Sequence, residues 1–150
     1  MKKFGKIAAA VLIFGLFIVF PAAAQKTRSD FQKMYTDFLK KRKLAYEITD
    51  TGDIYFTNTD GYHYWITVNE TEPLKFRIYA AFKLENVSRN DAIRAAHYAN
   101  YNEFGIKVYI SDDVDIAFFV FDGILPKAKD FALIFDKAIE VISNGVNYFF

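Results

Sequence analysis

The sequence of 150 residues contains no cysteine, only two histidines, three prolines and seven glycines. Without cysteine the chain can form no disulfide and can carry neither a thiol nucleophile nor a lipid-modified N-terminal cysteine. No glycine-rich phosphate loop occurs, so nothing in the sequence supports nucleotide binding. Aromatic residues, by contrast, are abundant, with 17 Phe, 10 Tyr and one Trp. The chain can therefore build a dense core and still have aromatic side chains left for its surface.

The sequence also has almost no excess of charge of either sign. The formal net charge is +1, which argues against a general polyanion binder. The three lysines of the first 24 residues account for that sign, because the rest of the chain has 16 basic and 18 acidic residues. We therefore predict no nucleic-acid partner.

The N-terminus has the three parts of a secretory signal peptide. Lys2, Lys3 and Lys6 form a basic region, residues 7–20 are apolar and uncharged, and Pro21 precedes three alanines. We predict a signal peptide over residues 1–24, cleavage before Gln25, and a bacterial protein that is periplasmic or secreted. The alternative is an uncleaved membrane anchor, since residues 7–24 approach the roughly 20 residues that span a bilayer.

The hydrophobic periodicity changes along the chain between that of helices and that of strands. It predicts helices over 29–43, with Ser29 as N-cap, and over 89–104, with Ser88 as N-cap and Gly105 as the stop. Strands are predicted over 44–48, 54–57, 62–68, 76–83, 106–110 and 114–121, and a third helix from Pro126 to a cap at Gly145. The order α-ββββ-α-ββ-α indicates an α+β fold with an antiparallel sheet flanked by helices.

The alternation within the strands also predicts the core. The first and third helices should share one face of the sheet, made by Leu44, Ile54, Phe56, Ile66, Ile78, Val108 and Phe118.

Several local signatures resemble those of a known family. They are Gly52-x-Ile54-x-Phe56, the Gly61-Tyr62 turn, Phe76-Arg77-Ile78, a helix carrying Asn100, and residues 107–110. Residues 30–143 resemble the YbjN-like bacterial proteins, which share the fold of type III secretion chaperones. The resemblance implies one domain over residues 25–150, a protein-binding or chaperone-like role, and no catalytic residues. The signal peptide departs from the secretion chaperones, which are cytoplasmic.

Little in the sequence supports catalysis. No G-x-S-x-G elbow and no H-E-x-x-H motif occurs, and His63 and His97 are the only histidines. Asp112, Asp113 and Asp115 lack the glycine and the distal glutamate of an EF-hand loop. We predict a protein that is not an enzyme and has no cofactor or metal.

The other face of the sheet is the strongest functional signal. Alternation is expected to place on it His63, Trp65, Arg77, Tyr79, Tyr109, Phe119 and Phe121. Trp, Tyr and Arg are the residue types that dominate protein interfaces. This face either binds a protein or peptide, or is covered by the second helix or by a second copy in a homodimer. The competing function is an envelope-associated structural protein, which would reach the membrane through an uncleaved N-terminal segment.

The stretch RAAHYANYNEFG, residues 94–105, contains one of the two histidines. Helical spacing predicts that His97 packs beside Ile93, Asn100 and Tyr101 as a structural residue. A polar Asn100 on the packing face is expected to bond the backbone of the sheet, as a structural residue.

Overall fold

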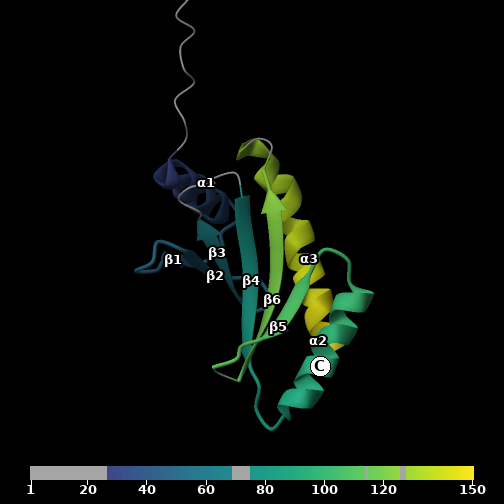
Figure 1. The fold of residues 1–150 in the computed structure, drawn as a ribbon. Helices are drawn as coiled ribbons and strands as arrows, with labels where there is room; N and C mark the ends of the chain where they lie inside the picture. Colours follow the sequence, from purple (N-terminus) through teal and green to yellow (C-terminus); the bar gives the residue numbers. More distant parts are fainter. Residues whose placement is uncertain (1–26, 69–74, 114, 126–127) are drawn as a thin grey trace, which may run out of the picture.

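The computed structural model describes residues 27–68, 75–113, 115–125 and 128–150 (Figure 1). The predicted signal peptide and Pro126 lie outside the described residues. The elements are α1 (Arg28–Lys41), β1 (Tyr46–Ile48), β2 (Ile54–Thr57), β3 (His63–Val68), β4 (Lys75–Lys83), α2 (Arg89–Asn102), β5 (Lys107–Ile110), β6 (Ile116–Ile124), the 3-10 turn η1 (Ala128–Asp130) and α3 (Phe131–Phe149). The predicted α+β class and the order α-ββββ-α-ββ-α are confirmed.

The six strands form one antiparallel sheet in the order β1-β2-β3-β4-β6-β5. Tight turns join the first strands, and Gly52 and Gly61 both have positive φ there, as such turns require. The last strand, β6, lies between β4 and β5 and is buried on both faces at Phe119 and Val120. Its continuous apolar run is typical of a central strand.

Helices α1 and α3 cover one face of the sheet and enclose the core. Phe131 of α3 contacts the rings of Tyr35 and Phe38 in α1, with centroids 4.6 and 5.1 Å apart. Arg42 at the end of α1 pairs with Asp136 of α3 at 2.6 Å. The predicted core residues Ile54, Phe56, Ile66, Ile78 and Val108 are buried on this face, and Leu44 packs against them.

The N-terminus of α1 is fixed by a capping box. The N-cap is Thr27 and not the predicted Ser29, because Thr27 and Asp30 exchange side-chain-to-backbone hydrogen bonds. Arg28 donates to the Thr51 carbonyl, and Gln32 donates to the Gly52 carbonyl at 2.9 Å. These two bonds tie the start of α1 to the β1–β2 turn.

Helix α2 packs against α3 and β5, and it does not cover the second face of the sheet (Figure 1). Its buried side is Ala92, Ala96 and Ala99, whose small side chains allow close approach. Ser88 is its N-cap as predicted, with its hydroxyl accepting from the Asp91 N–H. Gly105, at φ +94°, follows the helix where the predicted stop lies.

Helix α3 does not end at Gly145, so the predicted cap is wrong. It continues to Phe149, and Gly145 is buried within it. A Cβ at Gly145 would lie 2.3 Å from the Cδ1 of Ile106, so this glycine makes room for the start of β5. Among the described residues no helix is long and apolar enough to cross a membrane.

Candidate functional site: the open face of the sheet

The face of the sheet opposite α1 and α3, called the open face below, carries a row of aromatic side chains from five strands. Strand register places Tyr55 opposite Trp65, Trp65 opposite Tyr79, and Tyr109 opposite Phe118. We call the connected rings of this face the aromatic ladder: Tyr55, His63, Trp65, Tyr79, Phe118 and Tyr109. None of these side chains belongs to the helix-covered core.

Two pairs of rings in the ladder are stacked with nearly parallel planes. Trp65 and Tyr79 have centroids 5.4 Å apart and planes 10° apart, and Tyr109 and Phe118 have centroids 5.2 Å apart and planes 14° apart. Contacting carbon atoms lie about 3.5–4 Å apart, so rings lying side by side in one plane would need larger centroid separations. The faces of the two rings in each of these pairs therefore overlap.

One end of the ladder carries a polar pair. The Tyr55 hydroxyl and His63 Nδ1 are 2.6 Å apart, and their rings stack at 5.5 Å. The Thr57 hydroxyl lies 3.2 Å from the same nitrogen. His63 is exposed and outward-facing as predicted, and its contacts position its ring within the ladder.

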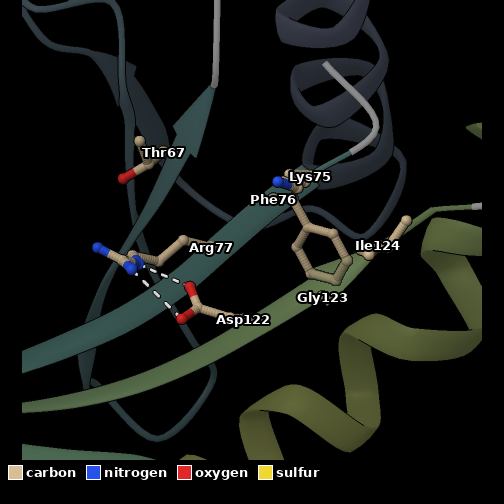
Figure 2. A pocket seen from close by; sticks show the side chains of 7 residues that line it. All are labelled: Thr67, Lys75, Phe76, Arg77, Asp122, Gly123 and Ile124. Atoms are coloured by element: carbon tan, nitrogen blue, oxygen red, sulfur yellow. Dashed lines mark hydrogen bonds and ion pairs between the residues drawn. The ribbon is translucent and has the colours of Figure 1, made fainter. Parts of the chain in front are cut away.

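Beside the ladder lies a charged cluster, defined as Arg77, Asp122 and Lys107. Figure 2 shows the pair of Arg77 and Asp122. Arg77 donates to Asp122 through Nε at 2.7 Å and Nη2 at 3.3 Å, and Lys107 Nζ donates to Asp122 Oδ2 at 2.8 Å. The hydrogen bond from Arg77 lowers the pKa of the Asp122 carboxyl, with Lys107 adding to this, and the same bond raises the pKa of Arg77. Burial among the rings raises the pKa of the Tyr79 hydroxyl.

Two shallow hollows adjoin this cluster. The larger, of about 520 Å³, is lined by Thr67, Lys75, Phe76, Arg77, Asp122, Gly123 and Ile124 (Figure 2). The smaller, of about 210 Å³, is lined by Thr67, Arg77, Tyr79, Tyr109 and Phe118. Because Thr67 and Arg77 line both, the hollows meet beside the ladder. A segment lying on the open face would thus contact aromatic and charged side chains together.

Five of the seven residues predicted for this face lie on it: His63, Trp65, Arg77, Tyr79 and Tyr109. The prediction was wrong for Phe119, which is 0% exposed in the core, and for Phe121, which packs against the core. Phe118, predicted for the core, lies in the ladder instead. The apolar run of β6 has no polar residue before Asp122 to show which side chains face outward, so its phase was misassigned.

Sequence reasoning missed Tyr55, Lys107 and Asp122. Each strand shows alternation by itself, but only the pairing between strands shows which residues are neighbours. Asp122 is paired with Arg77 in the register of β4 and β6. Had β6 been phased from Asp122 as an outward residue, Phe118 would have been assigned to the open face.

Asn100 acts on the sheet edge as predicted. Its Nδ2 donates to the Val108 carbonyl at 2.8 Å, and the Val108 N–H donates to its Oδ1 at 2.7 Å. The side-chain amide thereby satisfies the N–H and the C=O of Val108, which point away from β6 at this edge of the sheet. The packing prediction was wrong for His97, which is exposed because the buried side of α2 is its alanine side.

No group of three or more metal-ligating side chains is found in the part of the chain that the structure describes. The two histidines lie on different elements, His63 on β3 and His97 on α2. The side chains gathered at the open face are aromatic rings and an ion-pair cluster.

Comparison with solved structures gives five matching chains. YbjN from E. coli, described as a candidate transcription regulator, superposes with a TM-score of 0.62 over 76% of this chain and 87% of that chain, at 12% identity. The fold is YbjN-like. A chain of the HopA1–SchA chaperone–effector complex superposes with a TM-score of 0.51 over 75% of this chain and 92% of its own length, at 8% identity.

At such low identities the two matches show the fold and no more. This fold is YbjN-like and chaperone-like. No protein-family model matches the sequence, and no curated protein matches it either.

Proposed function

We propose that the protein is a binding module without catalytic activity, which holds a protein or peptide partner in a chaperone-like manner on the open face. The observation that carries the proposal is the aromatic ladder. Its rings come from five strands, contact one another, and lie on a face that no described helix covers. Soluble domains seldom expose contiguous apolar patches of this kind unless they bind something.

The composition of the face favours a protein partner. Trp65, Tyr79, Tyr109 and Arg77 belong to the residue types enriched in interface hot spots. A fold in common with a chain of a chaperone–effector complex is compatible with this role. A nucleic-acid partner is not proposed, because Asp122 lies between the cations of this face and acidic residues outnumber basic ones beyond residue 24.

The test is to replace Trp65 or Tyr79 by alanine. If these rings bind the partner, each substitution should weaken binding by about 2 kcal/mol, or roughly 30-fold in affinity. Co-purification from the native envelope, together with the molar mass of the purified protein in solution, measures partner binding and self-association. Tyr101→Ala is the matched control, because this tyrosine is 89% exposed on α2, outside the ladder. Unchanged co-purification and molar mass in both ladder variants would refute the proposal.

We further propose that the module is exported to the bacterial periplasm or exterior. The support is the basic, apolar and small-residue pattern of residues 1–24. N-terminal sequencing of the native protein is expected to begin at Gln25. A native protein that begins at Met1 would contradict cleavage and favour the uncleaved, envelope-anchored alternative.

A further inference from the structure

The open face is electrostatically uneven. Several of its cations, among them Lys75, Arg77 and Lys107, come from β4 and β5, whereas Glu47 and Asp53 lie at the β1–β2 side. Asp53 accepts a hydrogen bond from the Val68 N–H at 3.3 Å, which places this carboxylate near the end of β3. A charged segment crossing the sheet would therefore experience opposite signs at its two ends.

Asp122 neutralises only part of the positive end. Its single negative charge is shared by Arg77 and Lys107, and the two cations remain 47% and 70% exposed. Arg77 uses Nε and one Nη2 proton on Asp122, out of the five N–H donors of a guanidinium. Donors of both side chains thus remain for other acceptors or solvent, and Arg77 lines the hollow of Figure 2.

The aromatic rings add to this polarity. An aromatic ring carries negative charge on its faces and positive charge at its edge. Tyr79 stacks on Trp65 and Phe118 stacks on Tyr109, so one face of each ring is occupied, and both rings line the smaller hollow together with Arg77. Ring edges and cations both favour carboxylate oxygens.

We propose that the partner is a peptide segment with acidic side chains next to aromatic or other apolar ones, and that its carboxylates bind at Arg77 and Lys107. This inference rests on the proposed binding function. The apolar part of the segment lies over Trp65 and Tyr55, and the acidic part lies over β4, β6 and β5. The charge of the face thereby fixes the direction in which the segment crosses the sheet.

The test uses an array of ten-residue peptides with blocked termini and the purified full chain. Each peptide with aromatic residues and Asp or Glu has two counterparts, one with Asn or Gln and one with Lys at the same positions. Trp65, the only tryptophan of the chain, reports binding of tryptophan-free peptides through its fluorescence. The acidic peptides are expected to bind at least about fivefold more tightly than the neutral ones, with the preference falling at high salt.

Substituted chains connect the preference to the cluster. Arg77→Gln combined with Lys107→Gln should remove the preference for acidic peptides over their neutral counterparts. Lys137→Gln is the matched control, because Lys137 pairs with Glu140 on the surface of α3. A wild-type preference that survives in the doubly substituted chain would overturn the inference.

The remaining outcomes distinguish the two proposals. Equal binding of acidic and neutral peptides overturns the acidic partner and leaves the binding function standing. The neutral peptides are also measured with an unblocked C-terminus. If they then bind as tightly as the acidic ones, the site is assigned to a terminal carboxylate and the side-chain assignment is overturned. A complete absence of binding by peptides of every charge would overturn both proposals.

Discussion

Replacing Phe119 by alanine is expected to lower the free energy of unfolding by about 3–5 kcal/mol, the usual cost of deleting a buried phenylalanine. The side chain is 0% exposed and contacts the rings of Phe82 and Phe149, with centroids 5.5 and 5.3 Å away. The cavity would open between β6 and α3, in the centre of the core. Urea unfolding followed by circular dichroism measures the loss.

The neighbouring residue supplies the matched control. Phe118 lies on the open face, so Phe118→Ala should cost only about 1 kcal/mol, mainly through its cross-strand pair with Tyr109. The same substitution should weaken partner binding, because it removes a ring of the ladder. Equal destabilisation by the two substitutions, or a larger effect at Phe118, would show that the phase of β6 is the reverse of that described.

Replacing Asn100 by alanine is expected to lower the free energy of unfolding by about 1–2 kcal/mol. The substitution removes both hydrogen bonds to the Val108 backbone, and Val108 is buried, so its N–H and C=O lose their partner. Water can reach part of the site, because Asn100 itself is exposed, and this limits the cost. Thermal unfolding with a fitted free energy provides the measurement.

Asn102→Ala is the control for that substitution. Asn102 is the last residue of α2 and donates to the Tyr98 carbonyl at 2.8 Å, on the exposed side of the same helix. Its loss should cost less than about 0.5 kcal/mol, as for other surface substitutions. If Asn100→Ala were as mild as Asn102→Ala, the amide would not be the residue that ties α2 to β5.

The two edges of the sheet differ because of this amide. Asn100 occupies the outward backbone groups of β5 at Val108, and unpaired edge strands otherwise tend to pair with other chains. The opposite edge is the short strand β1, with Tyr46 and Ile48 exposed. A partner strand therefore cannot pair with the backbone of β5 at Val108, because Asn100 already holds both groups. The aromatic ladder and the charged cluster lie on the open face beside this edge.

The sequence by itself determined the elements and the class of the fold. Alternation in β2, β3 and β4 is clear because polar residues such as Thr57, Thr67 and Arg77 separate the apolar ones. Ser88 and Gly105 mark α2 through capping and positive φ, which are local effects. The same local signals placed His63, Trp65, Arg77 and Tyr79 on one face before any strand pairing was known.

Only the tertiary structure decided the features that depend on contacts between distant segments. The phase of β6 depends on its pairing with β4 and β5, because Phe118, Phe119 and Phe121 are equally apolar. Gly145 stays inside α3 because Ile106 occupies the space beside it, a contact between residues 39 positions apart. The charged cluster likewise joins residues of β4, β5 and β6. Periodicity reports the environment of one segment, whereas a binding face depends on which segments become neighbours.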